Sequence, residues 1–121
     1  PPRSTLFPYT TLFRSVKELK LLTHLDCMDC VNITNSSVKE LKLLTKLSCS
    51  DCPNITNASI KELKFLTELE CDNCPNITDE SVKELKFLTF IMCDDCPNIN
   101  RSTIEEIELR SEKSSYVSKY Y

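Results

Sequence analysis

A repeat of 22 residues runs through most of this 121-residue chain, and it constrains the fold more than any other feature of the sequence. Four complete copies begin at Val16, Val38, Ile60 and Val82, and a fifth begins at Ile104 before the pattern ends. The third copy reads IKELKFLTELECDNCPNITDES, and the others keep its framework of leucine, cysteine and isoleucine. Because one such unit is too short to bury its apolar side chains alone, successive units must stack on a common core.

Each unit is expected to form a strand, a turn and a short helix. The segment Leu22–Cys27 ends in an apolar and polar alternation that is typical of a half-buried strand. The segment Asn35–Leu43 instead spaces its apolar residues at three, as a short helix does. The chain contains no glycine, so every turn has to be made by Asn, Asp, Ser or Pro. We expect the helix N-caps at the residues that open each such segment: Asn35, Asn57 and Asp79.

Aligned on the strand, the copies read L-x-x-L-x-C-x-x-C-x-x-I-T/N-x-x-x-V/I-x-x-L/I. This pattern resembles the cysteine-containing class of leucine-rich repeat, over about residues 16–109. The resemblance implies an α/β solenoid of about four repeats, with a curved parallel sheet on the concave side and short helices on the convex side. It also implies an intracellular protein, cytoplasmic or nuclear. The chain departs from the class by placing cysteine where the sixth position is usually leucine: Cys27, Cys49, Cys71 and Cys93.

The best-known proteins of this class are substrate-recognition arms of F-box subunits in ubiquitin ligases. No F-box is found in this sequence, so that role is an alternative that depends on the resemblance alone.

The two ends of the chain differ from the repeats. Residues 1–15, PPRSTLFPYTTLFRS, match the translation of a universal adapter of short-read sequencing libraries, and we interpret them as an artefact rather than native sequence. We therefore expect the native protein to have begun upstream of Val16. Without Arg3 and Arg14 the chain has 13 basic and 18 acidic residues, a net charge of −5. After a final helix, residues 110–121 are expected to form a loose polar tail.

The eight cysteines form four Cys-x-x-Cys pairs, one in each repeat. The spacing between successive pairs fits a four-cysteine zinc site, and a redox pair or a disulfide ladder is a further alternative. The pairs recur at the structural period, at positions that the class uses for its core, so we favour buried free thiols. Such a core requires a reducing compartment. We therefore expect no metal and no other cofactor.

Catalysis and membrane insertion have little support in the sequence. His24 is the only histidine, and no phosphate-binding loop or recognised pairing of a nucleophile with a base is found. No apolar run approaches the roughly 18–20 residues of a membrane helix, and a secretory signal is missing. We expect a binding protein that is neither an enzyme nor membrane-bound.

The variable strand positions are the best candidates for binding a partner. They carry eight acidic residues against one lysine, whereas each KELK segment on the helical side adds one positive charge. A basic protein or peptide is therefore the expected partner, and nucleic acid is not expected on the concave face. A solvated acidic face that only keeps the stack soluble is the competing interpretation. The candidate partner-binding residues are His24, Asp26, Lys46, Glu68, Glu70, Asp72, Asp94 and two apolar anchors, Phe90 and Met92.

Overall fold

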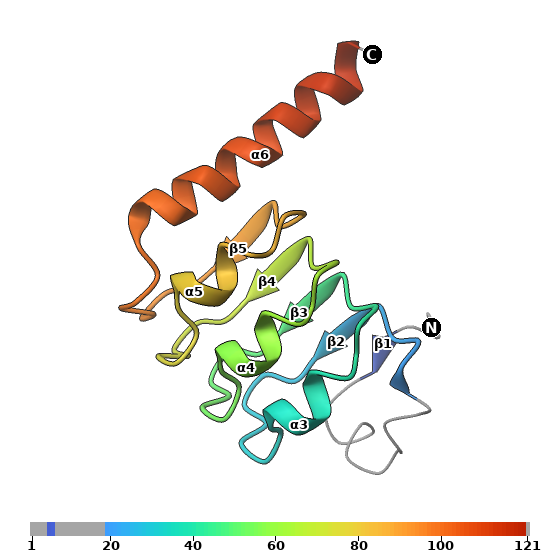
Figure 1. The fold of residues 1–121 in the computed structure, drawn as a ribbon, viewed down its shortest axis with the longest axis vertical. Helices are drawn as coiled ribbons and strands as arrows, with labels where there is room; N and C mark the ends of the chain where they lie inside the picture. The colour runs from blue at the N-terminus through green and yellow to red at the C-terminus, as the bar shows by residue number, and fades with distance from the viewer. Residues whose placement is uncertain (1–4, 7–18, 121) are drawn as a thin grey trace.

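The structure is a computed structural model that describes residues 5–6 and 19–120, with side chains described for residues 19–113. Strands and short helices alternate along the repeats, and a long helix follows them (Figure 1). The elements are β1 (Thr5–Leu6), β2 (His24–Asp26), α3 (Asn35–Val38), β3 (Lys46–Ser48), α4 (Asn57–Ile60), β4 (Glu68–Glu70), α5 (Asp79–Val82), β5 (Phe90–Met92) and α6 (Arg101–Tyr120).

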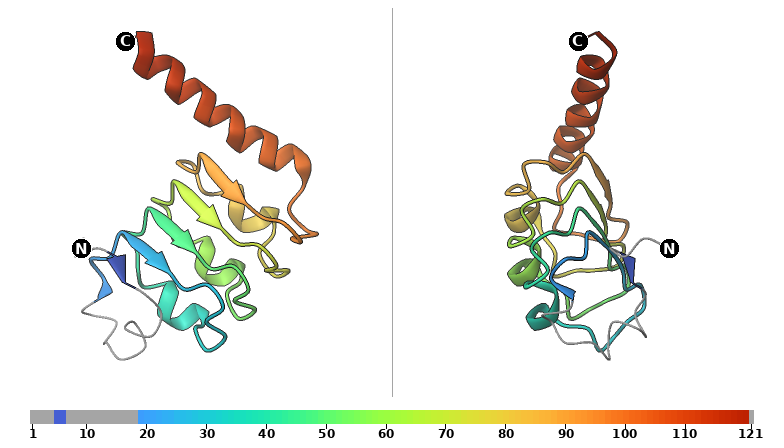
Figure 2. Two further views of the ribbon diagram at one scale, coloured as in Figure 1. Left: turned by 180° about the vertical axis from the view of Figure 1, so that it is seen from behind. Right: turned by 90° about the vertical axis from the view of Figure 1, so that its right-hand side faces the viewer.

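The five strands form one parallel sheet in the order of the sequence. The register places each residue opposite the one 22 positions later, so that Leu25, Leu47, Leu69 and Ile91 lie in one row. Helices α3, α4 and α5 stack on the other side of the molecule from the strands (Figure 2). The fold is an α/β solenoid of the leucine-rich-repeat type, as the sequence predicts.

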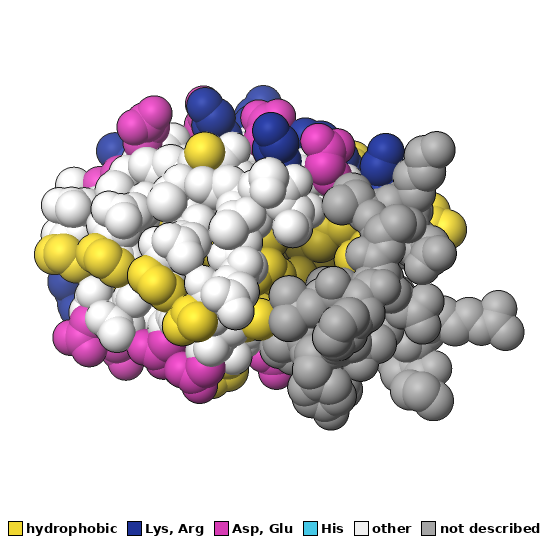
Figure 3. All heavy atoms as spheres, turned by 90° about the horizontal axis from the view of Figure 1, so that it is seen from below, with side chains coloured by type: hydrophobic (Ala, Val, Ile, Leu, Met, Phe, Trp, Pro, Cys, Tyr) yellow, Lys and Arg dark blue, Asp and Glu magenta, His cyan; other side chains and the backbone are white. Residues whose placement is uncertain are grey.

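The core lies between the strands and the helices, and it consists of rows of like side chains. In the second and third repeats, Leu44, Leu47, Leu66 and Leu69 are all buried. The row Ile33, Ile55, Ile77 and Ile99 is buried as well. The same repetition places surface side chains of one kind in rows, and an apolar row runs beside an acidic row on the face seen in Figure 3.

Helices α3, α4 and α5 are shorter than the sequence predicts. Each of them spans only four residues. After α3 the chain continues in two turns, in which the Leu41 amide donates to the Val38 carbonyl and the Leu44 amide to the Leu41 carbonyl. Bonds from residue i+3 to residue i bring every third side chain to the same side. The apolar spacing of three that suggested a helix thus arises from these turns. The KELK segments at 39–42, 61–64 and 83–86 lie in this stretch after the helices and not on them.

The predicted N-caps are also wrong by one position. The N-cap residues are Thr34, Thr56 and Thr78, and the asparagine or aspartate that follows each is the first helical residue. The Asn57 side chain contacts the next repeat: its Oδ1 accepts from the Thr78 amide (2.9 Å) and the Ser81 hydroxyl (2.6 Å), and its Nδ2 donates to Thr78 Oγ1 (2.7 Å). Asn35 makes the same three bonds to Thr56 and Ser59. These side chains tie neighbouring repeats together.

A turn after each strand uses the left-handed backbone region without glycine. Asp29, Asp51, Asn73 and Asp95 have φ between 57° and 61°. Among residues with a side chain, aspartate and asparagine enter this region at the lowest cost. The predicted use of polar residues in place of glycine is confirmed at these turns.

At the C-terminal end, helix α6 packs over the last repeat. Its Ile107 is buried, and the Arg110 guanidinium donates to the carbonyl oxygens of Leu85 (2.9 Å) and Leu88 (3.3 Å). The loose tail predicted for residues 110–121 is wrong up to Tyr120, because the helix continues to that residue. Arg110 therefore fixes the helix against the stack at the point where a tail was expected to begin.

The N-terminal end carries one strand that the repeat did not predict. Strand β1 pairs with β2 in parallel, with Thr5 opposite His24 and Leu6 opposite Leu25. The other residues of the segment interpreted as adapter lie outside the described part of the chain. That interpretation stays a prediction.

Candidate functional site

The candidate site is the outer surface of the sheet, which we call the strand face. It consists of the side chains that β2–β5 direct away from the core, with the residue two positions after β2, β4 and β5: His24, Asp26, Met28, Lys46, Ser48, Glu68, Glu70, Asp72, Phe90, Met92 and Asp94. The equivalent residue after β3, Ser50, is buried. All nine residues predicted to bind a partner belong to this surface. Its five carboxylates and one lysine give a net charge of −4 with His24 neutral.

The parallel register arranges these residues in rows across the strands. One row consists of His24, Lys46, Glu68 and Phe90. The next consists of Asp26, Ser48, Glu70 and Met92. Both rows therefore pass from polar groups at β2 to an exposed apolar side chain at β5.

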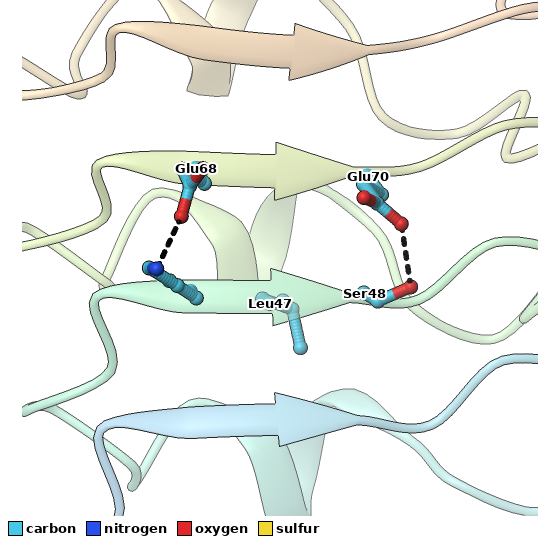
Figure 4. A pocket seen from close by; sticks show the side chains of 5 residues that line it. Leu47, Ser48, Glu68 and Glu70 are labelled. Carbon is cyan, nitrogen blue, oxygen red and sulfur yellow. Dashed lines mark hydrogen bonds and ion pairs between the residues drawn. The ribbon is translucent and has the colours of Figure 1, made fainter.

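Two polar contacts join β3 to β4 around a hollow of about 110 Å³ (Figure 4). Lys46 Nζ lies 2.9 Å from Glu68 Oε2, and Ser48 Oγ donates to Glu70 Oε2 at 3.2 Å. The Lys46 and Glu68 side chains are about half exposed, so water and salt weaken their attraction. A charged group from a partner is able to replace this ion pair at little cost.

Carboxylates at the end of a strand or just after it also accept backbone bonds. Asp72 Oδ1 accepts from the Asp94 amide at 2.8 Å, and Asp26 Oδ1 accepts from the Met28 amide at 3.2 Å. A carboxylate has several acceptor positions, so one backbone bond leaves capacity for a further donor. These side chains support the turns and still present negative charge.

The apolar end of the strand face lies on the last strand. Phe90 is 42% exposed and Met92 is 41% exposed, and both lie beside charged neighbours on the sheet. Large apolar side chains that remain exposed beside charged ones are common anchors in protein interfaces. The structure thus places the two predicted anchors side by side on one strand.

His24 makes a local contact rather than a link to the acidic groups. Its Nδ1 lies 2.9 Å from the Oγ1 of the adjacent Thr23. The side chain is half-buried on β2 and is part of the same row as Lys46. This contact orients the ring, and its role in binding stays a prediction.

The cysteines form a ladder inside the stack. The thiols of Cys52 and Cys74 donate to the carbonyl oxygens of Cys27 (2.8 Å) and Cys49 (3.1 Å) in the preceding repeat. Cys96 bonds the Cys71 carbonyl in the same way at 2.9 Å. All eight cysteines are free thiols, and six are buried, while Cys30 and Cys93 are half-buried. The thiols therefore serve as small core side chains that also satisfy buried carbonyls.

The surroundings of the stacked thiols shift their pKa values in two directions, upward for the first cysteine of a pair and downward for the second cysteine of the repeat that follows. Hydrogen bonding to the Cys52 thiol, together with burial, raises the pKa of Cys27 well above its usual range. The pKa of Cys71 is raised in the same way by Cys96 and by burial. At the last repeat, burial raises the pKa of Cys93 to about 11. The hydrogen bond with Cys71 lowers the pKa of Cys96 to about 7, and the pKa of Cys52 is lowered by its bond with Cys27. Since the thiolate is the reactive form and the metal ligand, Cys27, Cys71 and Cys93 are the thiols best suited to packing.

The arrangement does not favour the zinc alternative. The second cysteine of each of the last three pairs bonds the preceding repeat, which directs its sulfur into the stack rather than toward its own partner in the Cys-x-x-Cys pair. Within the described part of the chain, no group of three or more His, Cys, Asp or Glu side chains is placed to hold a metal ion. None of the described helices is long and apolar enough to cross a membrane.

Comparisons with known proteins add little to this description. No protein-family model matches the chain, and no curated protein matches it. Among solved structures, the chain is similar to the functional domain of InlJ from Listeria monocytogenes, which is described as including a cysteine ladder. The sequence identity is 20% and the TM-score 0.45, and the match covers 73% of this chain and 28% of that one.

Sequence reasoning found the strand face but missed a second exposed surface. Leu21, Leu43, Phe65 and Phe87 follow the KELK segments, where the repeat pattern alone counts them as framework residues. All four are exposed, and each is followed by a buried leucine. Two adjacent apolar residues at the same position in every repeat were the signal that one of them could face outward. These residues lie in the turns after the short helices, and the assignment of this stretch to a helix concealed their exposure.

Proposed function

We propose that this chain is a protein-interaction module whose strand face binds a basic segment of a partner protein. The observation that carries the proposal is the combination of five carboxylates and one lysine with two exposed apolar side chains, Phe90 and Met92, on one regular sheet. Positive side chains of a partner would contact Glu68, Glu70 and Asp72, and an apolar residue would pack against Phe90. Opposite charge accelerates association and selects the partner, while aromatic contacts stabilise the complex.

The test is fluorescence anisotropy with a labelled peptide that is rich in lysine and arginine and carries one leucine. Binding is expected, and its affinity should fall as salt concentration rises because surface charges are screened. The variant Glu70→Lys should weaken binding about tenfold or more, by replacing an attraction with a repulsion.

Glu84→Lys is the matched control, since it makes the same charge change at an exposed glutamate outside the strand face. It should leave the affinity within about twofold of wild type, which is less than 0.5 kcal/mol. Equal losses in both variants, or binding that does not depend on salt, would show that the strand face is not the site.

The proposal includes the kind of partner and the compartment. The strand face should not retain a DNA oligonucleotide in the same assay, because phosphate groups carry the wrong charge. Buried free thiols support an intracellular, reducing location, since oxidising compartments favour disulfides. A substrate-recognition arm of a ubiquitin ligase is one special case, and an F-box in the complete coding sequence would identify it.

A further inference from the structure

A second exposed surface lies outside the strand face, and we call it the apolar edge. It consists of Leu21, Leu43, Phe65 and Phe87, one residue from each repeat at the same position. Phe65 is 51% exposed and Phe87 57% exposed. Their rings stack with centroids 6.4 Å apart and planes inclined by 20°. Four large apolar side chains in a continuous exposed row are typical of a surface that binds a partner.

A shallow groove of about 490 Å³ follows the apolar edge. Leu43, Phe65 and Phe87 line it, together with threonines from the start of the strands. Thr45 Oγ1 donates to the Thr23 carbonyl (3.2 Å), and Thr67 Oγ1 donates to the Thr45 carbonyl (3.1 Å). The hydroxyl protons of Thr45 and Thr67 are therefore already used, which leaves a surface that mainly recognises apolar groups.

The groove discriminates between helical and extended ligands. An extended peptide needs partners for its backbone amides and carbonyls wherever binding removes water. The hydroxyls of Thr45 and Thr67 cannot donate to it, and the side chains of Leu43, Phe65 and Phe87 are apolar. A helix satisfies its own backbone bonds and presents a row of apolar side chains to such a groove. The lining thus favours a helix.

The charge beside the apolar edge indicates the sign of the charge that a ligand should carry. The KELK segments at 39–42, 61–64 and 83–86 hold six lysines and three glutamates. Lys42 and Lys64 pair with Glu62 (3.1 Å) and Glu84 (3.4 Å), but these pairs are half exposed and easily exchanged. Lys86 lines a hollow beside Phe87. The net charge of +3 along this flank is opposite to that of the strand face.

We infer that the apolar edge is a docking site for an acidic amphipathic helix of a partner protein. Leucine-type side chains of the helix pack into the groove over Phe65 and Phe87, and its glutamates pair with Lys42, Lys64 and Lys86. The site is independent of the strand face, which attracts ligands of the other charge. One chain is thereby able to bind a basic segment and an acidic helix at the same time.

The probe is a labelled designed helix of about 14 residues, long enough to contact four repeats, with leucines at i, i+3, i+4 and i+7 and glutamates beside them. We expect saturable binding to the full chain in fluorescence anisotropy. Phe65→Ser and Phe87→Ser should each weaken it about tenfold or more. Val31→Ser, which changes an equally exposed apolar residue elsewhere, should have no effect. Circular dichroism should show that all three variants are folded.

Three additional measurements distinguish the apolar edge from the strand face and from self-association. Glu70→Lys should leave the binding of the acidic helix intact, because Glu70 belongs to the strand face. The proposal would be overturned if a lysine version of the helix bound as tightly, or if a proline-substituted, non-helical version did so. It would also be overturned if the chain formed a dimer that Phe65→Ser dissociates, since the occupant would then be a second copy.

Discussion

The asparagine that joins two repeats provides the sharpest test of how the stack is held together. Asn57→Ala removes three hydrogen bonds to the following repeat, two to Thr78 and one to Ser81. Ser81 is fully buried, so water cannot replace the lost acceptor, and the Ser81 hydroxyl keeps only its longer bond to the Thr78 carbonyl, at 3.3 Å. With about 1 kcal/mol for each bond, the free energy of unfolding should fall by about 3 kcal/mol. The midpoint of thermal unfolding should fall by roughly 10–20 °C.

Urea unfolding followed by circular dichroism measures this change. Asn54→Ala is the matched control, because its exposed side chain makes a single bond to the Val31 carbonyl, at 2.9 Å. Asn54→Ala should lower the free energy of unfolding by less than about 1 kcal/mol. Asn57→Asp should cost little as well, since Asp79 occupies the same position in the next repeat and accepts from the Asn100 amide (3.0 Å).

The reasoning would be refuted if the free energy of unfolding of Asn57→Ala lay within about 0.5 kcal/mol of the wild-type value, a difference typical of neutral surface substitutions. An equal loss in Asn54→Ala would also contradict it. Either result would mean that apolar stacking alone holds the repeats in register.

Three further predictions follow from the local geometry. Thr56→Ala should lower the free energy of unfolding in urea by about 1–2 kcal/mol, because Thr56 Oγ1 caps α4 and accepts from Asn35. Thr34→Ala should lower it less, since Thr34 makes no capping bond. Asp95→Val should destabilise the chain by about 1–3 kcal/mol through its positive φ, while Asp95→Gly should be neutral or stabilising in the same measurement. At pH 7 the raised pKa of Cys93, about 11, should leave about a hundredfold less thiolate than an ordinary cysteine has. Iodoacetamide should therefore alkylate it slowly until guanidinium unfolds the chain, and equal rates before and after unfolding would contradict this.

The repeat was sufficient to predict the solenoid, the buried leucines and the outward positions of the strands. A period of 22 allows like residues to stack, and alternation at Leu25 and Asp26 indicates which side chain is buried. The ends followed no repeat, so β1 and the full length of α6 were not predictable in this way. At Arg110 the polar character of the sequence suggests the start of a tail, although two bonds from this residue to the last repeat fix the helix there.

The helix N-caps and the turns between the strands could not be predicted in this way, because they depend on contacts between neighbouring repeats. Thr56 and Asn57 are both good N-cap residues, and only the neighbouring repeat decides which of them caps the helix. The spacing of Val38, Leu41 and Leu44 fits a helix and a series of turns equally well. The apolar edge was overlooked for the same reason, since the turns and not a helix expose Phe65.

The tie between neighbouring repeats has a consequence for how the chain opens. Because each Asn35 or Asn57 bonds only the next unit, the loss of one end unit leaves the bonds of the others intact. Helix α6 covers the C-terminal unit, so fraying should begin at the other end of the sheet, at β1 and then β2, and advance along the chain. Amide hydrogen exchange should therefore be graded, with protection that rises from Leu25 to Leu69.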